Sequence, residues 1–240
     1  MRTDDLIRSL AADLRRVQPL RAVEQRTMLW AAFSLLSVLL GTLARGTRPD
    51  LASKLRDPVY LVETALLLAT FLLAGRSAFQ LSVPGAERSA RGRVLSIVGF
   101  LLWGAVVASD ASAPSPPSLN GASCIPTILG LALVPGLTVL LLLRKAAPLR
   151  PGWTAGVALL SAASLAVLAS VLVCAREDRL HLLLWHFAPV VLVVVIGSGL
   201  GRRLLRRAPI ALPWPGESRR TKAGPSLERD GSSLWIARRR

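Results

Sequence analysis

Six long apolar stretches, separated by short polar segments, are the feature of this sequence that most restricts its fold. They span residues 28–44, 59–75, 94–109, 122–143, 153–175 and 180–200. Each holds roughly 16 to 23 residues, and a helix needs about 20 to cross the hydrocarbon core of a bilayer. A single segment crosses only as a helix, because its backbone groups must pair with one another there. The sequence therefore predicts an all-α, polytopic bundle of six transmembrane helices.

The charged residues lie between and beyond these stretches, as they must in a membrane protein. Hydrophobic residues make up 52% of the 240 residues, yet the formal net charge is +16. We expect an amphipathic segment at 1–26, a transmembrane domain at 27–201 and a basic tail at 202–240, whose composition favours disorder. The exception is Glu63, an acid about one turn inside the second stretch, which we expect to reach headgroups or water.

The distribution of lysine and arginine predicts the orientation. With a cytoplasmic amino terminus, the inner segments contain 24 of the 30 basic residues and the outer segments contain 6. Cytoplasmic loops of membrane proteins carry an excess of lysine and arginine. The first outer loop, 45–58, fits least well because it holds four of the six. Both termini are therefore expected to be cytoplasmic.

This topology places the two cysteines near the same membrane face. Cys124 begins the fourth stretch and Cys174 ends the fifth, so both lie near the outer interface. Small residues recur every four positions along the fifth stretch, at Thr154, Ala158, Ala162, Ala166, Ser170 and Cys174. Such a ridge lets membrane helices approach closely, and the fourth helix is the expected neighbour. Two interpretations remain open: two buried small residues, or a disulfide, redox or metal pair.

The two histidines of the chain, His181 and His186, are predicted at the same end as the cysteines. Cys124, Cys174 and His181 are thus candidate metal ligands, because thiolate and imidazole suit zinc-type ions. The five-residue spacing places His181 and His186 on different faces of a regular helix. A site that uses both histidines is therefore not expected.

The amino-terminal segment has the pattern of a short amphipathic helix. Thr3 is a suitable helix cap, and Asp4 and Asp5 lie in the first turn, near the positive helix end. The apolar stripe consists of Leu6, Ile7, Leu10, Leu14 and Val17. Such a stripe docks in the groove of a partner protein or lies on membrane lipid with its arginines near anionic headgroups. Both partners remain open from the residues alone.

Several short motifs, in this order, resemble those of a known family. They are Met1-Arg-Thr-Asp-Asp-Leu-Ile-Arg-Ser-Leu-Ala-Ala-Asp13, Thr47-Arg-Pro-Asp-Leu51, Cys124-Ile-Pro126, Arg144-Lys-Ala-Ala-Pro-Leu-Arg-Pro151, the Cys174 region and Gly201-Arg-Arg-Leu-Leu205. Over roughly residues 1–207 the chain resembles the NrsF-type proteins, six-span membrane anti-sigma factors that act on extracytoplasmic-function sigma factors.

The resemblance implies a protein of the bacterial inner membrane that holds a sigma factor inactive at its cytoplasmic face and releases it under stress. It favours the sigma factor as partner of Asp4, Asp5, Leu6, Ile7, Leu10 and Leu14, and Cys124 and Cys174 as the sensing pair for metal or redox stress. Direct nucleic-acid binding and a cofactor are not expected. After Cys174 the family has a proline and a serine-proline turn, where this chain has Ala175-Arg-Glu-Asp-Arg179. The stimulus of this chain is therefore open.

Other functions find less support in the sequence. Motifs of zinc proteases, phosphate-binding loops and serine hydrolases are absent, so an enzyme is not expected. A small transporter or a membrane-structural protein is the alternative. A transporter predicts polar groups near the midplane and matching broken helices in two halves. The apolar stretches offer mainly serine and threonine, and no repeat relates the first three to the last three.

Overall fold

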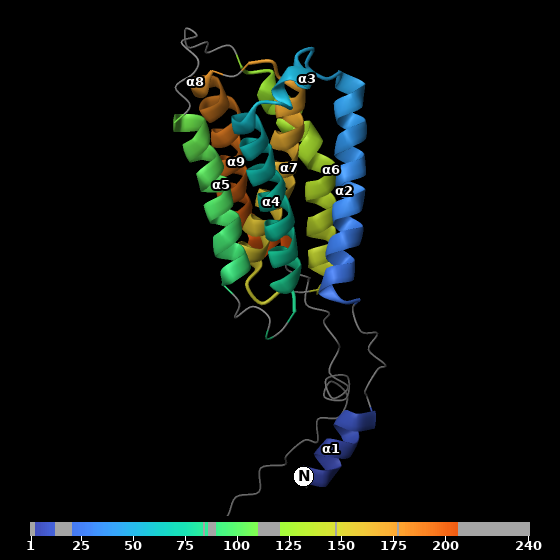
Figure 1. Cartoon of the computed structure of the whole chain (residues 1–240). Helices are drawn as coiled ribbons and strands as arrows, with labels where there is room; N and C mark the ends of the chain where they lie inside the picture. Colours follow the sequence, from blue (N-terminus) through green and yellow to red (C-terminus); the bar gives the residue numbers. More distant parts are fainter. Residues whose placement is uncertain are drawn as a thin grey trace, which may run out of the picture. The chain divides into compact units, whose positions relative to one another are not determined.

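The computed structural model describes residues 3–12, 21–83, 85, 90–109, 121–146, 148–176 and 178–205, and these form helices joined by short turns. The helices are α1 (Thr3–Ala12), α2 (Val23–Arg45), α3 (Leu51–Lys54), α4 (Pro58–Gln80), α5 (Arg91–Ser109), α6 (Cys124–Ala146), α7 (Pro151–Val173), α8 (Arg179–Leu182), a π-helix (Leu183–Phe187) and α9 (Ala188–Leu205). Figure 1 shows the long helices side by side in one bundle.

The prediction of an all-α bundle with six spans is confirmed. Within the described residues, six helices are long and apolar enough to cross a membrane: α2, α4, α5, α6, α7 and the continuous helix Arg179–Leu205. Each contains most of one predicted stretch. Large apolar side chains such as Leu36, Leu40 and Val195 are exposed on the surface of the bundle. A surface of this kind is suited to lipid and is typical of a multi-pass membrane protein.

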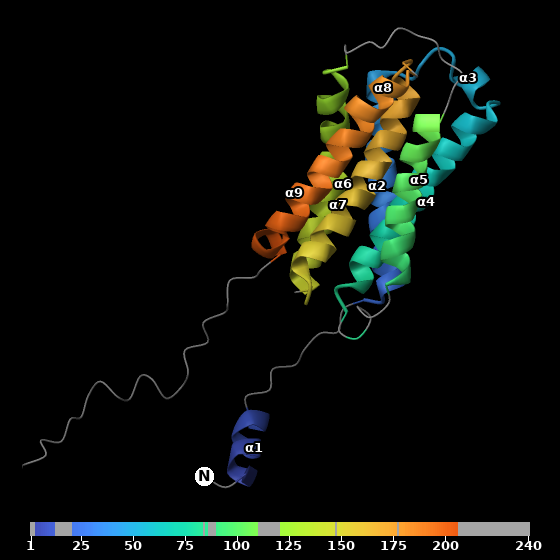
Figure 2. The same cartoon turned by 90° about the vertical axis from the view of Figure 1, so that its left-hand side faces the viewer.

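Helix α7 lies at the centre of the bundle. Of its most apolar 18-residue window, 78% is buried, whereas the corresponding share is 28–39% in the other five spans. It packs against α9, α4, α6 and α2, and Figures 1 and 2 show it between α4 and α9. The fourth span, α6, is thus one of several neighbours of α7. Because α7 contacts these four helices, a displacement of one of its ends would affect the packing of most of the bundle.

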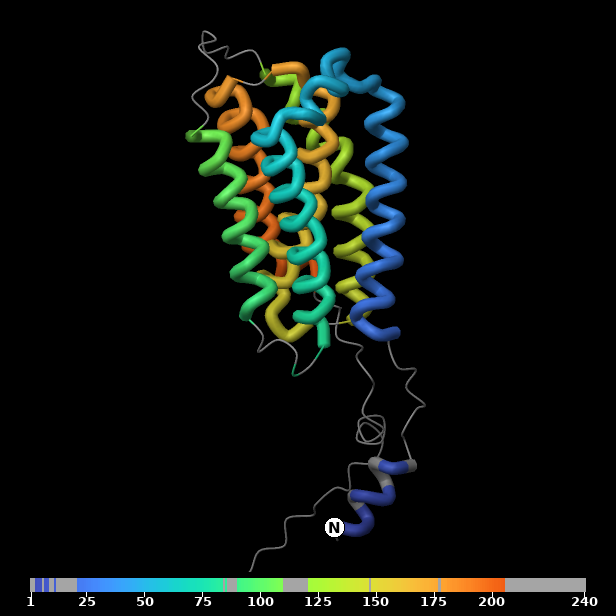
Figure 3. The backbone as a smooth tube through the Cα atoms, viewed as in Figure 1, coloured from blue at the N-terminus to red at the C-terminus, as the bar shows by residue number. Residues whose placement is uncertain are grey.

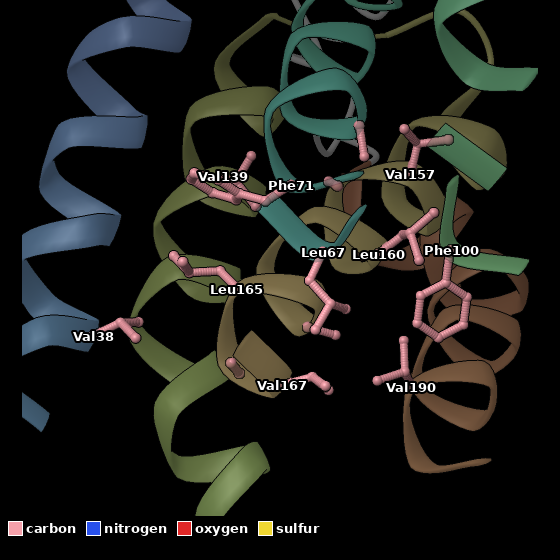
Figure 4. Packing of buried hydrophobic residues seen from close by; sticks show 14 of the residues in the cluster. Val38, Leu67, Phe71, Phe100, Val139, Val157, Leu160, Leu165, Val167 and Val190 are labelled. Atoms are coloured by element: carbon pink, nitrogen blue, oxygen red, sulfur yellow. The ribbon is translucent and has the colours of Figure 1, made fainter. Parts of the chain in front are cut away.

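Small side chains allow this close packing. The ridge residues Thr154, Ala158, Ala162 and Ala166 are almost fully buried. On α9, a Cβ atom added to Gly201 would lie 2.6 Å from the backbone carbonyl oxygen of Pro151 in α7. Larger side chains fill the remaining core, as Figure 4 shows for Val38, Leu67, Phe71, Phe100, Val139, Val157, Leu160, Leu165, Val167 and Val190.

Hydrogen bonds between helices add to the apolar packing. The Ser161 hydroxyl of α7 donates to the Phe71 carbonyl of α4 at 2.5 Å. The indole nitrogen of Trp30 in α2 donates to the Pro135 carbonyl of α6 at 3.2 Å. Buried polar groups need such partners, because unpaired ones cost free energy in an apolar interior.

Helices α3 and α8 lie at one end of the bundle, together with the start of α6 and the end of α7 (Figure 3). We call this end the cysteine end, because it carries Cys124 and Cys174. The carboxylate of Asp178 caps α8 by accepting a hydrogen bond from the backbone N–H of His181 at 2.8 Å.

The helix widens into a π-helix at Leu183–Phe187, directly before α9. Pro189 follows two residues later and has no backbone N–H to donate to the carbonyl of Trp185. Its ring would also crowd that carbonyl in a regular α-helix. The π-helix contains Trp185, whose carbonyl lacks this hydrogen bond. Because a π-helix has more residues per turn, residues before and after it face other directions than they would in a regular α-helix.

Candidate functional site

The two cysteines lie at the ends of neighbouring helices. Cys124 is the first residue of α6, and its backbone N–H donates to the Gly121 carbonyl at 2.8 Å. Cys174 directly follows α7, where its N–H donates to the Ser170 carbonyl at 2.7 Å. Both thiols are free and partly exposed. Their backbones are thus anchored in helix termini, while their side chains are available for chemistry.

His181 lies between the two cysteine side chains. Its Nε2 atom is 3.5 Å from Sγ of Cys124 and 3.5 Å from Sγ of Cys174. The imidazole is buried, with 1% of the residue surface exposed. The cap at Asp178 holds the first turn of α8 and so fixes the backbone of His181. The three predicted metal-ligand candidates therefore come together in space.

His186 joins the same cluster, contrary to the expectation from its spacing. The ring centroids of His181 and His186 are 5.4 Å apart. One potential ligand atom from each of Cys124, Cys174, His181 and His186 lies within 4.8 Å of all the others. The π-helix contains His186 and has more residues per turn than an α-helix, so the two histidines do not lie on the different faces expected of a regular helix.

A serine of α7 fixes the ring of His186. The Ser170 hydroxyl lies 3.0 Å from Nδ1 of His186 and donates to the Val167 carbonyl at 2.8 Å. A hydroxyl has one proton, so Ser170 accepts a hydrogen bond from an Nδ1–H group. The Nε2 atom of His186 then carries the free lone pair. It is buried and has no hydrogen-bond partner among the described residues.

Sequence reasoning missed Ser170 and His186 as parts of this cluster. Ser170 is one of the small ridge residues of α7 and is 2% exposed, and the four-residue pattern carries no sign of its contact with His186. Pro189, three residues after His186, was the available signal for an irregular turn.

A small cavity of about 40 Å³ lies beside Cys174. Arg48, Arg176 and Glu63 are among its lining residues. Glu63 is buried, with 8% of its surface exposed, and its expected contact with headgroups or water stays a prediction. The volume exceeds the roughly 10–15 Å³ that one water molecule needs. Small polar species therefore fit next to the Cys174 side chain.

The wall of this cavity is held by an ion pair. Arg48 binds the Asp50 carboxylate through two hydrogen bonds of 2.7 Å each. This interaction lowers the pKa of Asp50 to about 2, so the carboxylate is charged at neutral pH. The backbone N–H of Arg48 donates to the Leu172 carbonyl at 3.0 Å, near the end of α7. The loop before α3 is thereby attached to the helix end that precedes Cys174.

The predicted partner-binding segment forms helix α1, with Asp4 and Asp5 in its first turn. Asp4, Asp5 and Ile7 are exposed. Leu6 and Leu10 belong to α1 by their backbone, and Leu14 lies outside the described residues. The helix predicted for this segment is thus present at Thr3–Ala12.

A sequence model of the family described as "NrsF: Negative regulator of sigma F" matches residues 10–206, which include the six candidate membrane spans of the described residues. The chain belongs to the NrsF family. The NrsF family resemblance seen in the short motifs is thereby confirmed. Membership indicates a regulatory role, that of an anti-sigma factor.

A curated relative supports the same assignment. The Anti-sigma-F factor NrsF of Caulobacter vibrioides (strain NA1000 / CB15N) is 36% identical over 222 residues, which cover 86% of this chain and 100% of the relative. No solved structure matches the chain.

Proposed function

We propose that this chain is an integral anti-sigma factor of the bacterial inner membrane that sequesters an extracytoplasmic-function sigma factor and releases it on metal or redox stress. The observation that carries the proposal is the family match over residues 10–206, together with six spanning helices and a paired cysteine cluster at one bundle end. The relative in Caulobacter vibrioides is named an anti-sigma-F factor. The sigma factor and the stimulus are the parts that we infer for this chain.

The charge distribution supports an orientation with both termini in the cytoplasm. The excess of lysine and arginine lies in the segments on the side of the termini. A cytoplasmic amino terminus puts α1 in the compartment of the sigma factor. The cysteine end then faces the periplasmic side, where oxidants and metal ions arrive first.

Helix α1 is the segment that we assign to the sigma factor. Its apolar stripe, which includes the exposed Ile7, fits a groove on a partner protein. Asp4 and Asp5 add negative charge that complements a basic protein surface. Binding to the inner leaflet is the competing role of α1, and basic residues such as Arg8 would contribute to it. A sigma-factor partner is favoured because the family consists of anti-sigma factors.

A change at the cysteine pair is the signal in this proposal. Cys124 and Cys174 lie at the ends of α6 and α7, so a disulfide or a shared metal ion would fasten these two ends together. Helix α7 contacts α2, α4, α6 and α9. A shift of its end would therefore bias the packing of the whole bundle between a sigma-holding and a sigma-releasing arrangement.

Deletion of the gene tests the proposal. A strain without this protein should express the regulon of one extracytoplasmic-function sigma factor without stress, and expression of the full chain should restore repression. Transcript profiling of the deleted and complemented strains measures this. An unchanged transcript profile in the deletion strain, with the sigma-factor genes intact, would contradict the anti-sigma role.

A further inference from the structure

We propose that Cys124, Cys174, His181 and His186 together bind one divalent cation of the zinc type through two thiolates and two imidazoles. This inference deepens the proposed function, since it names a ligand class and two further residues for the sensing site. The binding itself is a property of the isolated protein and does not depend on a sigma factor. A metal titration of the purified protein and a reporter for the sigma regulon therefore test the two claims separately.

The distances fit a shared ion. Sulfur and nitrogen atoms bound to one tetrahedral zinc, at about 2.3 Å and 2.0 Å, lie about 3.5 Å from each other. Nε2 of His181 lies 3.5 Å from both cysteine Sγ atoms. Ligand atoms of all four residues lie within 4.8 Å of one another. A disulfide would explain only the two sulfurs and leave both histidine positions without a reason.

The hydrogen bonds of His186 favour the tautomer with its proton on Nδ1, which leaves Nε2 available to bind a metal ion. The Ser170 oxygen accepts a hydrogen bond from Nδ1–H, because its own hydroxyl donates a hydrogen bond to the Val167 carbonyl. The Nε2 atom therefore carries a lone pair, and it is buried without a partner among the described residues. Metal-binding histidines are commonly oriented by a hydrogen bond at the other ring nitrogen. We assign Nε2 of His186 as the fourth ligand atom.

The charges of the four groups match a divalent ion. Two thiolates and two neutral imidazoles around one doubly charged cation give a site with no net charge. Such a neutral site is favourable for partly or fully buried residues at the end of a membrane bundle, where an uncompensated charge is costly. Formation of the site releases two thiol protons to solvent for each ion bound.

The donor set selects the class of ion. Two sulfurs and two imidazole nitrogens in a tetrahedral arrangement are typical of zinc sites. Softer ions of the same charge, such as Cd²⁺, compete for the same thiolates. The site would join the start of α6, the end of α7 and the helix at 179–187, so its occupant would control how these three elements are connected.

The experiment uses the reduced full-length protein in detergent, titrated with Co²⁺ and then with Zn²⁺. We expect one Co²⁺ per chain, with absorption bands of thiolate-to-cobalt charge transfer and of four-coordinate cobalt, and displacement of Co²⁺ by Zn²⁺. X-ray absorption at the zinc edge should give two sulfur and two nitrogen neighbours. A wild-type protein without these cobalt bands at equimolar metal would overturn the inference.

Single substitutions test which residues bind the metal ion. His181→Gln and His186→Gln should each weaken Co²⁺ binding strongly. Ser170→Ala should weaken it by about 10-fold to 100-fold, as expected for loss of an orienting hydrogen bond. Ser164→Ala is the matched control, since Ser164 is an equally buried serine of α7 outside the cluster. Size-exclusion profiles and circular dichroism check the fold. Unchanged affinity and spectra in both histidine variants would reduce the site to the cysteines and contradict the inference.

A reporter for the sigma regulon distinguishes the failure of this inference from failure of the sensing role. If the purified protein binds no metal while cysteine variants lose their stress response, the metal site is wrong and cysteine sensing stands. If the protein binds Co²⁺ as described while cysteine variants respond normally, the metal site stands and the sensing proposal is wrong.

Discussion

Nε2 of His181 lies 3.5 Å from Sγ of Cys124, although 57 residues separate the two in the sequence. The same nitrogen lies 3.5 Å from Sγ of Cys174. His181 thus lies between the first residue of α6 and the residue that directly follows α7. A chemical change at either sulfur alters the contacts of the imidazole. His181 belongs to α8, which continues through the π-helix into α9, so such a change would also affect the position of α9.

The first prediction concerns the cysteine pair. Cys124→Ser and Cys174→Ser should each abolish most of the induction by metal or oxidant, and the double variant should resemble the single ones because the two residues act as a unit. Repression without stress should persist. A reporter for the sigma regulon measures both states. Ala175→Ser, which introduces the same residue at an exposed neighbouring position, should respond normally.

Full induction in both single cysteine variants, with repression intact, would show that Cys124 and Cys174 only contribute to packing and do not sense the stress. Loss of repression without stress in either variant would instead show that the thiols maintain the sigma-holding state.

The second prediction concerns the contact of α7 with α9. Gly201→Ala should destabilise the bundle by about 1–3 kcal/mol. The added Cβ atom would lie 2.6 Å from the Pro151 carbonyl oxygen and 2.8 Å from Cα of Gly152, and backbone atoms cannot swing away. The apparent unfolding temperature of the detergent-solubilised protein should therefore fall.

Gly199→Ala is the matched control, because an added Cβ atom meets nothing within 4 Å there. It should be neutral or stabilising by up to about 1 kcal/mol, since alanine favours helix more than glycine does. Equal unfolding temperatures for the Gly201 and Gly199 variants would contradict the close α7–α9 packing.

The third prediction concerns topology. Fusions of an alkaline phosphatase reporter after Asp50 should be active, and fusions after Leu149 should be inactive, because the lysine and arginine excess places the 144–152 segment in the cytoplasm. Fusions of a cytoplasmic reporter such as a fluorescent protein should give the opposite pattern. An active phosphatase after Leu149 would reverse the orientation and place the cysteine end in the cytoplasm.

The spans and the cysteine neighbourhood could be predicted from the sequence because they follow from local patterns. Hydropathy and length locate membrane helices well, and small residues at every fourth position mark a packing face such as the α7 ridge. The juxtaposition of Cys124 and Cys174 follows from their places at the ends of consecutive helices joined by a short loop.

The role of His186 could not be predicted in this way. Its place in the cluster depends on the π-helix, and a periodicity of 3.6 residues contains no such turn. The burial of Glu63 likewise depends on neighbours that come from other parts of the chain, including Arg48 and Arg176 around the shared cavity. Contacts of this kind arise from tertiary packing and leave no signal in a single helix.

The fourth prediction concerns the partner-binding stripe on α1. Ile7→Asp should release the sigma factor, because burial of a carboxylate in an apolar groove costs several kcal/mol in order of magnitude. Ala12→Asp is the matched control, since it introduces the same residue into α1 away from the stripe of Leu6, Ile7 and Leu10. Both variants should reach the membrane at wild-type levels, which immunoblots of membrane fractions check.

Affinity purification of the tagged full-length protein from unstressed cells tests the central claim most directly. Mass spectrometry of the eluate should identify one extracytoplasmic-function sigma factor, retained by the wild type and by Ala12→Asp and lost from Ile7→Asp. Recovery of the membrane protein at normal levels without any sigma factor would contradict the anti-sigma role, and retention of the sigma factor by Ile7→Asp would assign the α1 stripe to lipid.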